Sequence, residues 1–411
     1  MPIFTINFFL SIYNSKLTNI TSPTLKCLTK LKSLALRSCG IKYIGNDSLC
    51  LNSLTSLSLG ENQINQFSLN FENCRFSKLT WLSLGGNFLT SITSSYLKWF
   101  PSLEILYLSY NTIRYIASDA FSNLTNLNTL YLTNNQLTNL TDLNLEYITS
   151  LQTLFLFDNN LVHINCGIFE KLNSLKTLDL SRNQINFISD YAFDNLTSLS
   201  FLYLSNNKIN NIPQYLFTPS LTSLYYIDLS YNYLTTMELW PTYLPNVMSI
   251  NLQHNQIGKF TNKFGWAINN QSSQWLNYWY YSTRIIDLQY NSISSFGVND
   301  LQKYGICNIS DYQNILVNVF QFFNMNNNLI SCNCSNTLYD LQSIYSSYLY
   351  QTQCSNPANF AGKSILTYDS CTNLANFVPT NSIFCNQIQQ TSTLQISTLQ
   401  SSVHASSKIK I

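Results

Sequence analysis

One frame of apolar residues, L-x-x-L-x-L-x-x-N-x-I, recurs along most of this 411-residue chain. It is clearest in residues 175–185, where the fixed polar position is Asn183. Between Ser15 and Asn255 this position occurs in eleven successive units at intervals of 23 to 25 residues, a phase that chance apolar runs do not keep. Repeats of this length predict a solenoid in which each unit contacts mainly its neighbours.

The frame also predicts the structure of a unit. Leu178 and Leu180 flank an outward residue, Asp179, so this segment should be a short strand whose side chains alternate between two faces. Strands of successive units should pair in parallel. Asn183 should turn inward, where its side chain can satisfy backbone groups that the bend leaves unpaired.

The first two units depart from asparagine at this position, with Ser15 and Cys39. Cysteine is a familiar substitute there, and serine is a weaker one. The other half of each unit supplies apolar anchors, which in two consecutive units are Ile185, Ile188, Phe193, Leu196, Ile209, Ile212, Phe217 and Leu221. We expect loops, 3-10 turns and short helices on that side.

Two further units are displaced, because Asn291 follows Asn255 by 36 residues and Asn328 follows Asn291 by 37. The extra residues predict inserts at about 258–282 and 294–319, and inserts in solenoids form loops on one face. The first insert contains three of the six tryptophans, Trp266, Trp275 and Trp279. These rings either form an exposed interaction site or, as we favour, pack the insert onto the solenoid.

A cysteine pattern follows the last unit: Cys332 and Cys334, then Cys354 three residues before Pro357, then Cys371. Repeats and cysteines together resemble extracellular leucine-rich repeat proteins of the typical 24-residue class with a cysteine-flanked C-terminal cap, similar to Toll-like receptor, Slit and Nogo-receptor ectodomains. The resemblance covers about residues 8–371. Ile330–Ser331 replaces the usual proline-aromatic pair, and no N-terminal cysteine cap is present.

The resemblance implies an α/β fold, a leucine-rich repeat horseshoe solenoid. Its parallel concave sheet should have about 13 strands, and its convex side should hold loops, 3-10 turns and short helices. The family pattern also implies the bridges Cys332–Cys354 and Cys334–Cys371. We expect the solenoid at 1–330, the disulfide-linked cap at 331–385 and a disordered Ser/Thr/Gln-rich tail at 386–411.

Three other cysteines, Cys27, Cys50 and Cys74, fall 11 to 12 residues past the asparagine position of successive units, so they should be neighbours. This spacing is compatible with a Cys27–Cys50 disulfide and with buried free thiols, and we favour the free thiols. Cys166, Cys307 and Cys385 have no obvious partners.

The chain carries eight N-x-S/T sequons, which with the cysteine cap favour an extracellular or secreted protein. No signal peptide is visible, so we expect the chain to be N-terminally incomplete. No apolar run reaches the roughly 18 residues of a membrane helix, although an anchor could have been lost. The glycosylation candidates are Asn19, Asn46, Asn123, Asn139, Asn195, Asn270, Asn308 and Asn333.

Function should reside in the outward side chains of the strands, where a rigid aromatic row beside carboxylates suits protein recognition. Tyrosine and aspartate are also common consensus residues there, so a purely structural role is the alternative. The outward position between the two strand leucines forms one column of side chains along the sheet, and Trp81 lies in a neighbouring column. The candidate binding residues on the sheet are Tyr107, Tyr131, Phe155, Phe157, Asp179, Phe201, Tyr203, Tyr226 and Asp228.

Other function classes find little support. A net charge of +2 gives no basic patch for nucleic acid. The three histidines lie outside any nucleophile motif, and neither a phosphate-binding glycine loop nor zinc spacing occurs, so we expect no enzyme, no cofactor and no metal. We expect a non-catalytic protein-binding module, with a glycan or microbial ligand as an alternative. A structural adhesion or matrix protein and an intracellular scaffold are the other readings.

Overall fold

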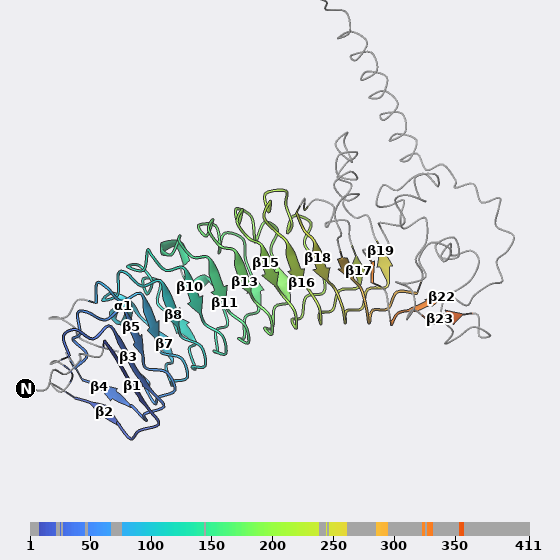
Figure 1. The fold of residues 1–411 in the computed structure, drawn as a ribbon. Coiled ribbons are helices and arrows are strands. Elements are labelled where there is room, and N and C mark those ends of the chain that lie inside the picture. The colour runs from blue at the N-terminus through green and yellow to red at the C-terminus, as the bar shows by residue number, and fades with distance from the viewer. Residues whose placement is uncertain are drawn as a thin grey trace, which may run out of the picture. The chain divides into compact units, whose positions relative to one another are not determined.

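A computed structural model describes residues 8–21, 25, 28–45, 48–66, 76–143, 145–237, 244, 246–260, 285–294, 323–324, 327–331 and 353–356. The chain forms two compact units, Met1–Tyr233 and Leu234–Ile411. In the first unit, strands of successive repeats lie side by side along the solenoid (Figure 1). They are β1 (Phe9–Tyr13), β3 (Ser33–Arg37), β5 (Ser56–Ser58), β6 (Trp81–Ser83), β8 (Ile105–Tyr107), β10 (Thr129–Tyr131), β11 (Thr153–Phe155), β13 (Thr177–Asp179), β15 (Phe201–Tyr203) and β16 (Tyr226–Asp228).

The second unit adds three strands of the same kind, β18 (Ser249–Asn251), β20 (Ile285–Asp287) and β21 (Phe323–Asn324), which pair in that order. The number of these strands is thereby thirteen, and they are parallel. The predicted fold, a leucine-rich repeat solenoid with a long parallel sheet, is confirmed. We call the outward side of these strands within one unit the sheet face.

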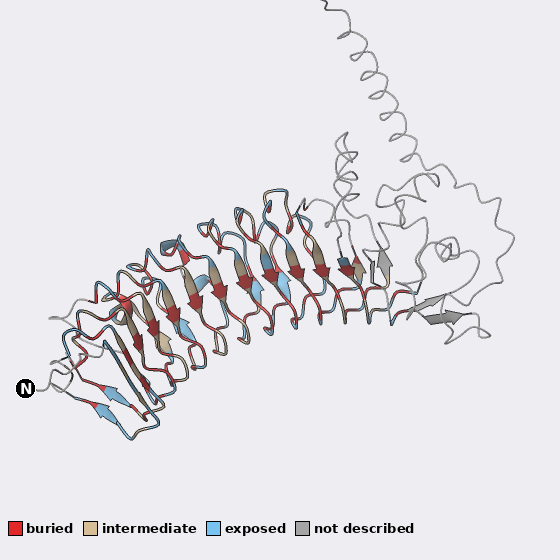
Figure 2. Cartoon of the chain, viewed as in Figure 1, coloured by how far each residue is buried: buried red, intermediate tan, exposed pale blue. Residues whose placement is uncertain are grey.

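Alternation of burial explains why these segments become strands. The middle residue of a strand such as β10 is a fully buried leucine, Leu130, and its neighbours Thr129 and Tyr131 are half-buried on the sheet face. Figure 2 shows this mixture of buried and intermediate residues on successive strands of the long sheet. Each leucine therefore removes apolar surface from water while its neighbours remain available to contact other molecules.

Inward-turned asparagines hold neighbouring repeats together. Asn135 accepts a hydrogen bond on Oδ1 from the Ile113 backbone N–H at 3.0 Å. Its Nδ2 donates to the carbonyl oxygens of Leu108 and Leu132, both at 3.0 Å. The same pattern recurs along the solenoid, so each side chain satisfies backbone groups of two repeats that would otherwise be buried unpaired. The asparagines at this position are Asn62, Asn87, Asn111, Asn135, Asn159, Asn183, Asn207, Asn232, Asn255, Asn291 and Asn328.

The first two units behave as their sequence predicts. Cys39 is buried, its backbone N–H donates to Oδ1 of Asn62 at 3.0 Å, and its Sγ donates to the Ile12 carbonyl at 3.3 Å. Ser15 is the poorer substitute, because its Oγ is buried and has no hydrogen-bond partner. A serine side chain is too short to bridge two repeats as asparagine does.

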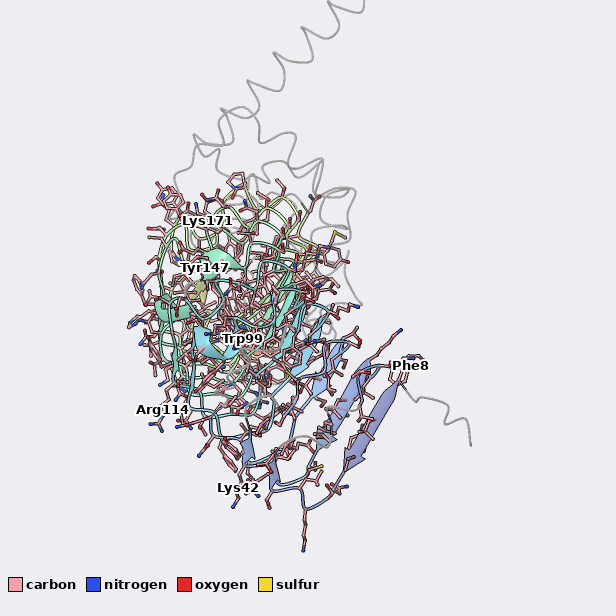
Figure 3. All side chains as sticks on the ribbon, turned by 90° about the vertical axis from the view of Figure 1, so that its left-hand side faces the viewer. Phe8, Lys42, Trp99, Arg114, Tyr147 and Lys171 are labelled. Carbon is pink, nitrogen blue, oxygen red and sulfur yellow. The ribbon has the colours of Figure 1, made fainter. Side chains whose placement is uncertain are left out.

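The flank opposite the sheet is built from short strand pairs and brief helices. Figure 3 places the labelled Trp99 and Tyr147 on this flank, away from the strand that follows Phe8. The pairs are β2 (Asn19–Ile20) with β4 (Tyr43–Ile44), β7 (Ser91–Ile92) with β9 (Tyr115–Ile116), β12 (His163–Ile164) with β14 (Phe187–Ile188), β17 (Thr236–Met237) with β19 (Lys259–Phe260), and β22 (Leu329–Ser331) with β23 (Gln353–Asn356). The helical turns are α1 (Ser94–Leu97), η1 (Thr141–Leu143) and η2 (Leu145–Tyr147).

The core lies between the sheet and this flank. The predicted anchors from Ile185 to Leu221 are all buried. Phenylalanines from consecutive repeats also meet there: the rings of Phe169 and Phe193 stack with centroids 6.0 Å apart, and both are fully buried. Because successive repeats make the same contacts, the hydrophobic core continues from one repeat to the next instead of forming one globular core.

Cys50 is disulfide-bonded, so the favoured interpretation of Cys50 as a buried free thiol is wrong. Cys27 and Cys74, the two cysteines that share its repeat position, lie outside the described residues. The repeat places equivalent residues side by side, which is the proximity a disulfide needs. Elsewhere in the described chain, Cys39 and Cys166 are free thiols.

Several predicted features fall outside the described residues. They are the tryptophans of the first insert, the sequons at Asn46, Asn270, Asn308 and Asn333, the tail at 386–411, and three cap cysteines, Cys332, Cys334 and Cys371. The backbone of Cys354, the fourth cap cysteine, lies in β23 opposite Ile330 of β22. Within the described ranges, no helix has the length and apolar character required to cross a membrane.

Candidate functional site

The sheet face of the first unit carries one continuous row of predicted site residues. The strand register places Tyr107 opposite Tyr131, Tyr131 opposite Phe155, and Phe155 opposite Asp179. The row continues through Tyr203 to Asp228. Each of these residues ends its strand and is half-buried, held between inward leucines. The 24- or 25-residue period thus brings residues from six repeats into one line.

The aromatic part of this row is an ordered stack. Ring centroids of Tyr107 and Tyr131 are 4.1 Å apart with an interplanar angle of 7°, and those of Tyr131 and Phe155 are 4.9 Å apart at 18°. Trp81, from the neighbouring column of β6, lies against Tyr107 at 5.4 Å and 55°. We call Trp81, Tyr107, Tyr131 and Phe155 the aromatic row.

Stacking changes what the aromatic row presents to solvent. One face of Tyr107 and one face of Tyr131 cover each other, so the edges of the rings are what the pair can offer to a partner. Burial, and then the hydrogen bond with Tyr107, raise the pKa of Tyr131 to about 12. The row is therefore a rigid, largely apolar ridge with hydroxyl groups on it. Such a ridge provides contact area with little loss of side-chain entropy on binding.

The two carboxylates of the row also have a structural role. The Ser181 backbone N–H donates to Oδ1 of Asp179 at 2.9 Å. The Ser230 N–H donates to Oδ1 of Asp228 at 3.0 Å, and the Ser230 hydroxyl donates to the same atom at 2.7 Å. Each aspartate thus closes a turn at the end of its strand. The signal in the sequence is the D-L-S triplet that both repeats share.

The hydrogen bonds to these carboxylates come from uncharged serine groups. Among the described residues, neither Asp179 nor Asp228 belongs to an ion pair. Burial raises the pKa of Asp179, opposed by its hydrogen bonds from Ser181, and Asp228 raises it further. Burial, followed by both carboxylates, also raises the pKa of Tyr203, which lies between them.

The remaining candidates surround the row. Phe201, at the start of β15, is 37% exposed and lies 6.0 Å from the ring of Tyr225. Tyr226, at the start of β16, lies 5.5 Å from Tyr203. Phe157 follows β11 and is covered by the guanidinium of Arg182, 5.3 Å from the ring centroid. These residues widen the row into an aromatic surface.

A second column was not foreseen from the sequence. The residue directly before the inward asparagine, or before Ser15 and Cys39 at the same position, adopts a left-handed backbone conformation in each described repeat, with φ between 51° and 58° at the non-glycine residues and 67° at Gly86. Asparagine and glycine tolerate this conformation, whereas tyrosine and arginine rarely adopt it. The sequence does not indicate this column, because most of its positions carry side chains other than glycine or asparagine. The column comprises Asn14, Ser38, Glu61, Gly86, Tyr110, Asn134, Asp158, Arg182, Asn206, Tyr231, His254, Tyr290 and Asn327.

Sequons in the described part of the chain are exposed and lie away from the sheet face. Asn19 is in β2, and Asn123, Asn139 and Asn195 lie in the loops that lead back to the next strand. Attached sugars would leave the aromatic row uncovered. No group of three or more His, Cys, Asp or Glu residues in the described ranges could hold a metal ion.

Comparison with known families agrees with this geometry. A family model of the leucine rich repeat matches residues 77–137, 149–209 and 202–257. A model of the BspA type leucine rich repeat region matches residues 7–96. The chain is a leucine-rich repeat protein. Its repeats therefore share their frame with a family as well as with one another.

Individual relatives match parts of this leucine-rich repeat chain. Toll-like receptor 3 of Bos taurus is 32% identical over 100 residues, which are 23% of this chain and 11% of the receptor. A leucine-rich repeat protein of Leptospira interrogans has a TM-score of 0.60 at 21% identity, covering 82% of this chain and 75% of that one. A structure of Latrophilin 3 and Unc5D with the leucine-rich repeats of FLRT2 has a TM-score of 0.58 at 19% identity, covering 88% of this chain and 97% of the matched one. The two structural likenesses show the fold alone.

Proposed function

We propose that this protein is an extracellular, non-catalytic recognition module that binds a protein partner on the sheet face of its first unit. The proposal rests on the aromatic row, in which the rings of Tyr107, Tyr131 and Phe155 are aligned and stacked and the ring of Trp81 lies tilted against Tyr107. Aromatic side chains of this kind dominate the energetics of protein interfaces when they are rigid and can be desolvated. The contacts within the row supply that rigidity before any partner arrives.

Relatives support binding as the general role. The FLRT2 leucine-rich repeats occur in a complex with two other proteins, and Toll-like receptor 3 is named as a receptor. A leucine-rich repeat solenoid offers its long sheet as an extended surface, and the sheet here carries more aromatic side chains than packing of the interior requires. Catalysis has no comparable support among the described residues.

The extracellular compartment is supported by three features. Cys50 is disulfide-bonded, and disulfides persist in oxidising compartments. The described sequons are exposed on the flank where sugars would be tolerated. The third feature is the similarity to Toll-like receptor 3. An intracellular scaffold would instead keep its cysteines reduced, so mass spectrometry of the native protein for the Cys50 bridge and for the bridges Cys332–Cys354 and Cys334–Cys371 distinguishes the two.

The binding role is tested by affinity capture from the extracellular proteins of the source cells. Wild-type protein and the variant Tyr107→Ala/Tyr131→Ala/Phe155→Ala are immobilised at equal density. We expect partners on the wild type that the variant fails to retain. A matched control changes three exposed aromatics away from the sheet, Tyr115→Ala/Tyr147→Ala/Phe187→Ala, and should capture the same proteins as the wild type. Equal capture by all three proteins would place the binding surface elsewhere.

A further inference from the structure

The charged residues within the strands of the sheet face are one-sided, whereas Arg182, which follows β13, lies over the ring of Phe157. From β6 to β16 the strand residues include two charged side chains, Asp179 and Asp228, and both are acidic. They are half-buried, and in the described structure neither has a cationic partner. Burial, and after it the negative charge of Asp228, raises the pKa of Asp179, because both disfavour its charged form. The position between them is therefore electrostatically complementary to a cation.

Tyr203 occupies that position. The strand register puts it between Asp179 and Asp228, and its ring is tilted by 51° against Tyr226. A ring at this tilt does not cover the face of Tyr203 as the parallel rings of Tyr107 and Tyr131 cover each other. An ammonium or guanidinium group over Tyr203 would gain a cation–π contact and two carboxylates together.

The stack in the aromatic row argues against a sugar as the main ligand there. Sugars commonly bind by laying their C–H groups on an open aromatic face, and the faces within the row are occupied by neighbouring rings. The exposed edges and hydroxyl groups suit apolar side chains and backbone carbonyls instead. The combination favours a polypeptide that presents an apolar part to the row and a cation to the acidic end.

We infer that the partner places a lysine or arginine side chain over Tyr203, between the carboxylates of Asp179 and Asp228, while its apolar side chains contact the aromatic row. This inference rests on the proposed function, because it specifies the chemistry of the partner that occupies the sheet face. Strands of a sheet lie about 4.8 Å apart. Phe155 and Tyr203 are two strands apart, so the apolar and basic groups of the partner should be about 10 Å apart.

A conservative substitution is available within the chain itself. In β18 the equivalent position is Asn251, whose Oδ1 accepts a hydrogen bond from the Gln253 backbone N–H at 3.1 Å. Asparagine thus closes the same turn without a charge. The variant Asp179→Asn/Asp228→Asn should keep the turns and remove the negative charge, and an unchanged circular dichroism spectrum and melting temperature will verify that the fold is retained.

The test uses random dodecapeptides displayed on phage. Selections run in parallel on the wild type, on Asp179→Asn/Asp228→Asn, and on Tyr107→Ala/Tyr131→Ala/Phe155→Ala. We call Tyr107→Ala/Tyr131→Ala/Phe155→Ala the aromatic variant and Asp179→Asn/Asp228→Asn the asparagine variant. Peptides that the wild type selects and the aromatic variant does not select should be enriched in lysine and arginine. Peptides selected on the asparagine variant should lack this enrichment. Synthetic versions of the enriched peptides should bind the asparagine variant at least about tenfold more weakly.

Two results would overturn the inference. If peptides depend on the aromatic row but show no excess of lysine or arginine, or if the asparagine variant selects the same basic sequences, the cation position is wrong while the proposed function stands. If the aromatic variant selects the same peptides as the wild type, the sheet face is not the binding surface, and both proposals fail.

Discussion

Tyr107 and Tyr131 stack face to face across adjacent strands, with ring centroids 4.1 Å apart and planes within 7° of parallel. Neither residue is near the other in sequence, and their contact follows from the 24-residue period that pairs β8 with β10. The consequence is a preformed ridge on the sheet face. Burial and then the hydrogen bond with Tyr107 raise the pKa of Tyr131, and the stack fixes the shape that a partner contacts.

The first prediction concerns the pKa of Tyr131. Its value of about 12 is raised above the ordinary 10.0, first by burial and then by Tyr107. A raised tyrosine pKa adds stability below pH 10 that is lost as pH rises toward 12. The spectrophotometric titration of the wild type minus that of Tyr131→Phe should show one tyrosine with a midpoint near 12. Repeated in a Tyr107→Phe background, this midpoint should move down, and a midpoint near 10 in the wild-type background would contradict the stacked arrangement.

The second prediction concerns the inward asparagines. Asn135→Ala removes four hydrogen bonds, and it leaves buried backbone groups of Ile113, Leu108 and Leu132 short of partners. Each unsatisfied group costs about 1–3 kcal/mol, so the free energy of unfolding in urea should fall by roughly 3 kcal/mol or more. The matched control is Asn160→Ala at an exposed position, which should change it by less than about 0.5 kcal/mol. Equal effects of the two substitutions would show that the inward asparagines do not stabilise the fold.

The sequence predicted the solenoid because the fold depends on a repeated local rule. Inward residues such as Leu130 and Asn135 recur at fixed positions in the units from Asn62 onward, so their burial and pairing could be predicted from spacing alone. The alignment of Tyr107, Tyr131 and Phe155 was predictable for the same reason. The stacking geometry was not, because it depends on side-chain rotamers and strand twist, which spacing does not contain.

Features without a repeat were harder to predict. The disulfide of Cys50 could not be predicted, because spacing indicates which cysteines are near one another but not whether they are oxidised. The hydrogen bonds of Asp179 and Asp228 to Ser181 and Ser230 were also missed. Their D-L-S triplets carry that signal, but a carboxylate that closes a turn and one that awaits a ligand look alike in sequence.

The third prediction concerns the column of residues that adopt a left-handed backbone conformation directly before the inward asparagines. Tyr110 has φ of 58° and is 64% exposed, so it contributes strain and little packing. Tyr110→Asn should raise the free energy of unfolding by about 0.5–1 kcal/mol, because asparagine adopts this conformation more readily. Asn134, at φ 54° in the next repeat, allows the reciprocal test. Asn134→Tyr should lower the free energy of unfolding by a similar amount, and changes of the same sign for both variants would refute the conformational explanation.

The fourth prediction concerns acid stability at the first repeats. Arg37 and then Ser38 donate hydrogen bonds to the carboxylate of Glu61 and lower its pKa from 4.5 to about 2. A lowered carboxyl pKa adds stability above pH 4.5 that is lost as pH falls toward 2. The wild type should therefore exceed Glu61→Gln in unfolding free energy at pH 6, and the difference should vanish near pH 2. A difference that is the same at both pH values would mean that the ion pair is not formed in solution.

The central claim is that the aromatic row is the surface that binds a partner protein. The most direct test is the affinity of the captured partner for three proteins, measured by isothermal titration calorimetry: the wild type, Tyr107→Ala/Tyr131→Ala/Phe155→Ala, and Tyr115→Ala/Tyr147→Ala/Phe187→Ala. Truncating aromatic interface anchors costs about 2 kcal/mol or more in total, so the sheet variant should bind at least about thirtyfold more weakly. The flank variant should bind as the wild type does. Wild-type affinity in the sheet variant, or a loss confined to the flank variant, would contradict the account.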